Sequence, residues 1–130
     1  MVDGDTLRVE DLGGRELGRV RLLGIDAPEV AHPPAPAECY ADQATDLLEE
    51  ELAPVGSIVQ LVTDSGQPDR DRYDRLLRYV DHAGVDVAHE LLARGAVRRY
   101  EAAQDLAREE SYSAAADDAQ GAERGLWGTC

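Results

Sequence analysis

Short runs of alternating apolar and polar residues mark the beginning of the chain. Residues 7–9 alternate in this way, and residues 16–23 do so until they end in two leucines. Asp-Gly at 3–4 and the polar residues 11–14 are turn formers on either side of the first run. Because short turns of this kind join neighbouring antiparallel strands, we predict strands at 7–9 and 16–23 in a small meander.

The pattern changes to a helical period after residue 38. Apolar residues then recur on one face of a helix, at Tyr40, Ala44, Leu47, Leu48 and Leu52. Pro54 and Gly56 follow them, and both residue types end helices. We therefore predict an amphipathic helix that starts near residue 38 and stops before Pro54.

Three further strands and two further helices are predicted in the remainder of the chain. We expect the strands at 57–62, 76–80 and 96–99 and the helices at 86–94 and 109–122. Asp86 is a favourable N-cap for the first of these helices, and Gly95 is a favourable stop. This order indicates a single α+β domain over residues 1–130, with a partly open five-stranded β-barrel and three α-helices.

The net charge of the chain is −14, and all 13 basic residues are arginine. Such an excess of acid argues against a generic basic nucleic-acid-binding protein or a membrane-surface protein. No apolar run reaches the roughly 18 residues that a membrane span needs, and no segment resembles a signal peptide. Because the first motif starts at Asp3, we expect that part of a first strand is missing from this sequence.

Cys39 and Cys130 are the only cysteines, and neither has the spacing of a zinc ligand. A disulfide between them would tie the first helix to the C-terminal segment and would stabilise the fold by up to roughly 4–5 kcal/mol in the chain-entropy model. The alternative is a pair of free, buried thiols. We expect the disulfide.

Residues 21–29 carry the first candidate chemistry. They read Arg-Leu-Leu-Gly-Ile-Asp-Ala-Pro-Glu, a strand that ends in a tight charged turn. The turn would deliver Arg21, Asp26 and Glu29 to the rim of a sheet. Hard metal ions prefer carboxylate oxygens and phosphates prefer guanidinium groups, so this rim would suit both. Taken alone, the segment is equally compatible with an ordinary polar hairpin end.

Three segments in one order are more specific than any of them alone: Asp-Gly-Asp-Thr at 3–6, residues 21–29, and Asp-Arg-Tyr-Asp-Arg-Leu-Leu at 71–77. Together they resemble the staphylococcal nuclease (thermonuclease) family. The resemblance extends over nearly the whole chain, through His32-Pro33, residues 38–40, residues 86–95 and Gly125-Leu126-Trp127. It implies an OB-fold barrel and a calcium-dependent endonuclease that hydrolyses phosphodiester bonds of DNA and/or RNA with little sequence specificity.

The resemblance also implies a metal site. Asp5 and Asp26 would supply carboxylate oxygens to Ca²⁺, and the backbone carbonyl of Ala27 would supply a third ligand. Calcium accepts six to eight oxygen ligands in irregular geometry, so water and a substrate phosphate would complete the shell.

Catalytic roles follow from the same resemblance. Glu29 stands where the family places the carboxylate that activates or orients the attacking water. Arg21 and Arg75 would clamp the scissile phosphate, because planar guanidinium groups bind its oxygens in pairs. For Arg21 the alternative is an ordinary surface ion pair.

Substrate contacts are expected around this centre. Arg72 and Tyr73 match positions that contact a terminal phosphate in the family, and Tyr100 would stack on a base. For each tyrosine, packing in the core or at the rim is an equally good explanation.

Besides the missing part of the first strand, two features depart from the family pattern. Asp74 stands where the family usually has glycine before the second arginine, and a glycine there would serve a positive φ. The strong acidity is the second feature, because counterion release supplies most non-specific affinity for nucleic acid. We therefore expect weak substrate binding.

The sequence thus predicts a monomeric calcium-dependent nuclease that is secreted or displayed at the cell surface. One alternative is a catalytically weak or inactive nuclease-like module that binds nucleic acid or protein. Another is a structural domain of a larger secreted or cell-wall protein. The presence of both arginines and all three carboxylates favours the enzyme.

Overall fold

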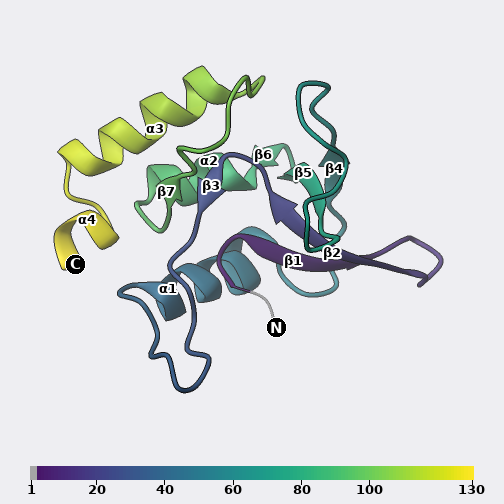
Figure 1. Cartoon of the computed structure of the whole chain (residues 1–130), viewed down its shortest axis with the longest axis horizontal. Helices are drawn as coiled ribbons and strands as arrows, with labels where there is room; N and C mark the ends of the chain where they lie inside the picture. Colours follow the sequence, from purple (N-terminus) through teal and green to yellow (C-terminus); the bar gives the residue numbers. More distant parts are fainter. Residues whose placement is uncertain (1–2) are drawn as a thin grey trace.

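A five-stranded mixed sheet forms the centre of the computed structural model, which describes residues 3–130 (Figure 1). Strands β1 (Thr6–Glu10) and β2 (Glu16–Leu22) are antiparallel, and Thr6 lies directly opposite Arg21. Their hairpin extends from one side of the molecule (Figure 1). The two strands confirm the predicted meander.

Strand β5 (Leu76–His82) pairs in parallel with β2 and lies in the middle of the sheet. Strand β4 (Gln60–Val62) and strand β6 (Val85–Asp86) both pair antiparallel with β5. A separate two-stranded ladder joins β3 (Ile25–Asp26) to β7 (Arg98–Arg99). The α+β class and the OB-like architecture are therefore confirmed.

The first helix differs from its prediction. Helix α1 (Ala41–Asp46) starts three residues later than expected, because Tyr40 has a left-handed backbone with φ of 73°. It continues directly as the π-helix η1 (Leu47–Leu52), whose wider turns keep Leu48 and Leu52 buried. The apolar face was predicted correctly, and the change of helix type was not.

The remaining helices agree closely with their predicted bounds. Asp86 caps α2 (Val87–Ala93) by accepting the His89 N–H at 3.1 Å, and Gly95 stops it with a φ of 71°. Helix α3 (Glu109–Gly121) and the single turn α4 (Leu126–Thr129) follow on one side of the molecule (Figure 1).

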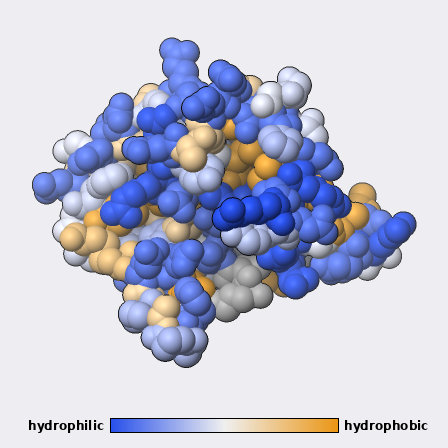
Figure 2. Space-filling model, in the orientation of Figure 1, coloured by the Kyte–Doolittle hydropathy of each residue, from blue (hydrophilic) through white to orange (hydrophobic). Residues whose placement is uncertain are grey.

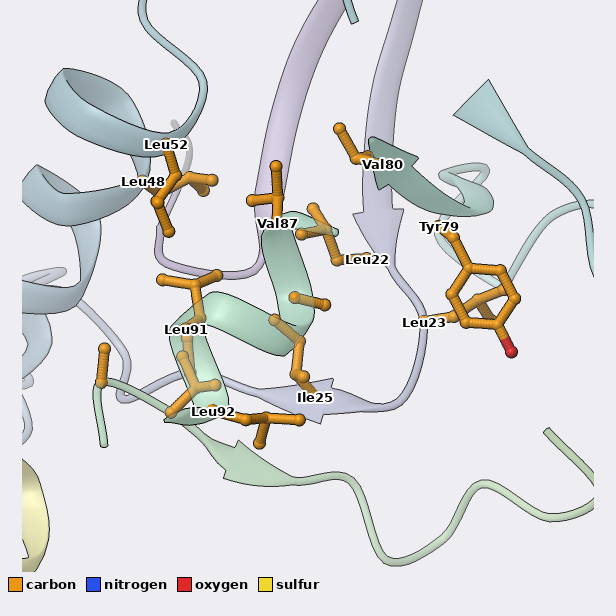
Figure 3. Packing of buried hydrophobic residues seen from close by; sticks show 14 of the residues in the cluster. Leu22, Leu23, Ile25, Leu48, Leu52, Tyr79, Val80, Val87, Leu91 and Leu92 are labelled. Carbon is orange, nitrogen blue, oxygen red and sulfur yellow. The ribbon is translucent and has the colours of Figure 1, made fainter. Parts of the chain in front are cut away.

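Helix α2 is the centre of the hydrophobic core. Its side chains Val87, Leu91 and Leu92 pack against residues from η1, β2, β3 and β5 (Figure 3). All three are fully buried, so replacing either leucine with alanine would cost about 2–5 kcal/mol. Because β2 and β3 pack against this core, the charged residues at their ends are held on well-packed strands.

Strand β4 is shorter than predicted, since it begins at Gln60 and not at residue 57. Both the N–H and the hydroxyl of Ser57 donate to the carbonyl of Pro54, at 2.9 and 2.5 Å. The backbone at Ser57 is therefore used in a turn and is not available to the sheet.

The C-terminal segment is fixed at two points. Leu126 donates its N–H to the carbonyl of Gly95 at 2.8 Å, which docks α4 at the end of α2. Cys39 and Cys130 form a disulfide with a Cα–Cα distance of 6.0 Å. Among the described residues, no helix is both long and apolar enough to cross a membrane.

Candidate functional site

The register of three strands brings two arginines and one aspartate together. Thr6 lies opposite Arg21 across β1 and β2, and Val20 pairs with Leu76, the residue after Arg75, across β2 and β5. Arg21 and Arg75 are therefore placed around the start of β1, which Asp5 precedes.

Hydrogen bonds connect these side chains in series. Nη1 of Arg75 donates to Oγ1 of Thr6 at 3.4 Å, and Thr6 donates its hydroxyl to Oδ1 of Asp5 at 2.9 Å. Nη2 of Arg21 lies 3.5 Å from Oδ2 of Asp5. A single carboxylate thus links the two guanidinium groups.

Asp5 is buried and ionised. Its Oδ2 also accepts the backbone N–H of Ala27 at 2.9 Å. Burial opposes ionisation, but the Arg21 guanidinium, the neighbouring Asp3 and the Ala27 N–H hold the pKa of Asp5 below its usual range. The N–H of Ala27, the residue predicted to bind metal through its carbonyl, therefore helps to fix the first carboxylate.

Two other carboxyl groups near Asp5 are not stabilised in this way. Burial, together with the adjacent Asp5 carboxylate, raises the pKa of Asp3 to about 7. Burial and the charge of Asp5 also raise the pKa of Asp26, which ends β3, while Arg21 opposes the shift. The start of β1 and the end of β3 therefore carry negative charge that one arginine does not fully balance.

Glu29 lies on the exposed loop after β3. Its backbone is held by Glu38, whose carboxylate accepts the Glu29 N–H at 2.7 Å and whose own N–H donates to the Glu29 carbonyl at 2.9 Å. Within residues 3–130 the Glu29 carboxylate itself has neither a hydrogen bond nor an ion pair. Glu29 and Glu38 both contribute to the raised pKa of Asp26, which places their charges near the rim.

Asp71 orients the second arginine. Its Oδ2 accepts Nε of Arg75 at 2.8 Å, and its Oδ1 accepts the backbone N–H groups of Tyr73 and Arg75 at 2.9 and 3.0 Å. Although burial opposes ionisation, these hydrogen bonds lower the pKa of Asp71. The loop before β5 is thus a rigid mount for Arg75.

The predicted substrate residues surround the arginines. Arg21 lies over the ring of Tyr100 at 5.4 Å, and Arg75 lies over the ring of Tyr73 at 5.4 Å. Arg72 also contacts Tyr73, because its Nη2 donates to the tyrosine hydroxyl at 2.8 Å. Tyr73 and Tyr100 are both about half exposed, so neither is a core residue.

Sequence reasoning missed the residues that hold the others in place: Asp3, Thr6, Glu38 and Asp71. Each of them lies inside a segment that was singled out, and Asp3 and Thr6 belong to the Asp-Gly-Asp-Thr turn. An aspartate side chain often accepts the backbone N–H of the residue two positions later and so forms a turn. Asp71 could have been found from this preference.

Asp5 and Asp26 offer oxygen donors of the kind that hard cations such as calcium accept. The described part of the chain contains no ready group of three or more metal-ligating side chains. Asp5 and Asp26 are carboxylates that repel each other, and a cation between them would relieve that repulsion. Calcium tolerates such a sparse set because carbonyl groups and water complete its shell.

The face of the molecule in Figure 2 is predominantly hydrophilic, with smaller hydrophobic areas between the hydrophilic residues. Aspartates alternate with the arginines of the 69–78 segment. Asp69 pairs with Arg78 at 2.6 Å, and Asp74 pairs with Arg70 at 3.5 Å. The guanidinium groups near the rim are therefore partly neutralised.

Comparison with known proteins gives one consistent result. Residues 19–129 match the family model described as staphylococcal nuclease homologue. The chain is 32% identical over 99 residues to the thermonuclease of Staphylococcus hyicus, covering 76% of this chain and 54% of that protein.

Two relatives from Bacillus subtilis are similar. Endonuclease YncB is 37% identical over 97 residues, which cover 75% of this chain and 44% of that protein. The SPbeta prophage-derived endonuclease YokF is 39% identical over 97 residues, covering 75% of this chain and 31% of that protein. The chain spans about half the length, or less, of these curated relatives.

Proposed function

Since the chain belongs to the staphylococcal nuclease family, we propose that it hydrolyses phosphodiester bonds of DNA and/or RNA in a calcium-dependent reaction. The observation that carries the proposal is the continuous connection from Tyr100 through Arg21, Asp5, Thr6 and Arg75 to Tyr73. It surrounds one buried carboxylate with two guanidinium groups and two exposed aromatic rings.

Arg21 and Arg75 bind the phosphate group that is cut. A phosphodiester carries its charge on two non-bridging oxygens, and guanidinium groups on two sides stabilise the charge that develops there. Asp71 fixes Arg75 before substrate arrives, so little side-chain freedom is lost on binding.

Glu29 orients the attacking water. Its backbone is clasped by Glu38 and its carboxylate is free of protein partners within residues 3–130, which leaves the carboxylate available to accept a proton from water. The water oxygen forms the new bond to phosphorus as the bond to the leaving ester oxygen breaks, and that oxygen takes up a proton from solvent and departs as a hydroxyl group.

Asp5, Asp26 and the Ala27 carbonyl would hold the calcium ion, which would supply Lewis-acid stabilisation of the phosphate charge when bound. The chain acts as a monomer outside the cell or at its surface. The disulfide supports that location, since such bonds persist in oxidising compartments.

Cleavage of heat-denatured DNA in calcium and in EDTA tests this proposal. The parent protein is expected to cut only with calcium, and Glu29→Gln is expected to lose cutting while keeping the circular dichroism spectrum of the parent. Glu50→Gln is the matched control, because Glu50 is exposed on η1 and lies outside the site. A folded parent that binds the DNA without cutting it would instead identify a nucleic-acid-binding module.

A further inference from the structure

A pocket adjoins the candidate site. It has a volume of about 440 Å³ and lies between the β3–β7 ladder, the segment after β7, and helices α3 and α4. Asp26 forms part of its wall, so the pocket is continuous with the rim that holds the candidate metal ligands. Its size is in the range of small-molecule sites.

Aromatic rings stand on two sides of this β3–α4 pocket. Trp127 comes from α4 and Tyr100 from the segment after β7. Each ring carries a guanidinium group, with Arg98 over Trp127 at 5.1 Å and Arg21 over Tyr100 at 5.4 Å. Paired rings with a cation beside each are the contacts that unstacked nucleobases use.

Arg98 is the available cation of the pocket. Its guanidinium has no ion-pair or hydrogen-bond partner within residues 3–130, whereas the neighbouring Arg99 is paired with Glu109. Because Arg98 is exposed, a phosphate that reaches the pocket would meet a guanidinium group that no carboxylate has neutralised.

The part of the pocket wall that α3 contributes is partly polar. Asp117 and Gln120 reach it from α3, where their carboxylate and amide groups are suited to the donors and acceptors on base edges. With Asp26 and Glu101 also present, the pocket holds more acid than a bare phosphate site would tolerate. A base with one attached phosphate fits this mixed chemistry better than an inorganic anion does.

We propose that the β3–α4 pocket binds a further nucleotide of the single-stranded substrate, next to the phosphate that is cut. The base lies against Trp127, and its phosphate contacts Arg98. The proposal rests on the proposed nuclease function, which supplies the strand, and adds to it a substrate position that does not touch the reacting phosphate.

Trp127 provides a direct probe, because it is the only tryptophan of the chain. A deoxythymidine tetranucleotide with phosphorothioate linkages resists cutting and can be titrated in the presence of calcium. We expect it to quench the Trp127 emission at saturation, and thymidine 5′-phosphate to do so at least tenfold less effectively, since one nucleotide lacks the neighbouring contact.

Arg98→Gln is expected to weaken the tetranucleotide's affinity about tenfold, the size expected for a lost charged hydrogen bond. Arg15→Gln is the matched control, because it removes the same charge from the exposed β1–β2 turn. Ala102→Leu fills the pocket from an exposed position without removing a core contact, and is expected to weaken binding by a similar factor.

The outcomes separate the two proposals. Equal affinities of Arg98→Gln and Arg15→Gln, or a tetranucleotide that leaves the emission unchanged, would overturn the pocket assignment even if the parent cuts DNA. Quenching that Arg98→Gln weakens would support the pocket even if the parent does not cut, and in that case only the hydrolytic proposal fails.

Discussion

Two arginine–carboxylate clusters stand on different sides of β5, and they differ in how completely the arginine is satisfied. Arg108 meets both oxygens of Asp81 at 2.9 and 3.2 Å, meets Asp86 at 2.8 Å, and lies over the Tyr79 ring at 4.4 Å. Arg21 has one carboxylate, Asp5, at 3.5 Å. The same side-chain types therefore make a saturated cluster in one place and an open one in the other.

The electrostatic consequences differ accordingly. Hydrogen bonds with Asp81 and Asp86 raise the pKa of Arg108, so its cluster gains from the charges it contains. Around Asp5, in contrast, Asp3 and Asp26 have raised pKa values because their charges are not balanced. A saturated cluster fixes the fold, whereas an unbalanced one leaves both a guanidinium group and carboxylates for a ligand to satisfy.

The Arg108 cluster has a clear structural task. It joins β5, β6 and the start of α3, and the hydroxyl of Tyr112 on α3 donates to the same Asp86 that caps α2. Because α3 also forms a wall of the β3–α4 pocket, the saturated cluster helps to position that pocket.

Replacing the open arginine should have the largest effect. We expect Arg21→Gln to reduce the rate of calcium-dependent cutting by about 10²–10³-fold, because one phosphate contact is lost in the transition state. The free energy of unfolding is also expected to fall, by about 1–3 kcal/mol, because Arg21 donates to the Leu22 carbonyl at 2.7 Å and is the guanidinium group beside the buried Asp5. Initial rates and urea denaturation of the same preparations measure both quantities.

Arg8→Gln is the matched control, since Arg8 on β1 is exposed and pairs with the exposed Glu16. A rate for Arg21→Gln within threefold of this control would remove Arg21 from the reaction.

The saturated arginine should affect stability without affecting the cutting rate. Arg108→Gln leaves Asp81 and Asp86 without their partner, and we expect it to lower the free energy of unfolding by about 3 kcal/mol. The cutting rate of the folded fraction should stay close to that of the parent. Urea denaturation, with rates measured at low temperature, tests this separation.

Arg94→Gln removes an exposed ion-paired arginine and is expected to cost less than about 1 kcal/mol. If Arg108→Gln were equally mild, the cluster would not hold the fold as argued above.

Acid should destabilise the folded protein through Asp64. Although burial opposes ionisation, the Tyr79 hydroxyl and the backbone N–H groups of Ala107 and Gly66 lower the pKa of Asp64. A lowered pKa means that the stabilisation is complete above the unfolded value, about 3.9, and is lost as the pH falls through the lower folded value.

We therefore expect Asp64→Asn to cost about 1–3 kcal/mol at pH 7, and the difference from the parent to shrink as the pH falls below about 4. Urea denaturation at pH 7 and at pH 3 measures it. Asp105→Asn, at an exposed loop position, is the matched control. A difference that does not depend on pH would mean that the charge of Asp64 is not what stabilises this contact.

The comparison also explains what the sequence could predict. Alternation and helical period located β1, β2, α2 and α3, because one face of each element is buried in the core. The two-residue strands β3 and β6 and the π-helix η1 left no pattern, since they are too short or depend on tertiary packing.

The same limit applies to the site. Motifs identified Asp5, Arg21 and Arg75 individually, but their connection through Thr6 depends on the parallel pairing of β2 with β5. Residues 76–80 read as a strand in any sheet order, so no local pattern specifies that pairing. The saturation of Arg108 was unpredictable for the same reason, because its partners lie 22 and 27 residues away.

The smallest expected effect concerns the loop that carries Arg75. Asp74 has a φ of 62°, which confirms that this position uses the left-handed conformation expected of a glycine. Asp74→Gly should stabilise the protein by less than about 1 kcal/mol, because glycine adopts that conformation without strain. It also removes a carboxylate next to a phosphate-binding arginine, so we expect cutting to become a few times faster.

Asp74→Ala separates the two causes of that gain. Alanine removes the carboxylate but keeps the strained backbone, so a faster Asp74→Ala would assign the gain to charge, and a gain confined to Asp74→Gly would assign it to the backbone. The Arg70–Asp74 ion pair that both variants lose is exposed and contributes little to stability. If neither variant is faster than the parent at saturating calcium, Asp74 does not restrain Arg75, whose position is then set by Asp71 and Thr6.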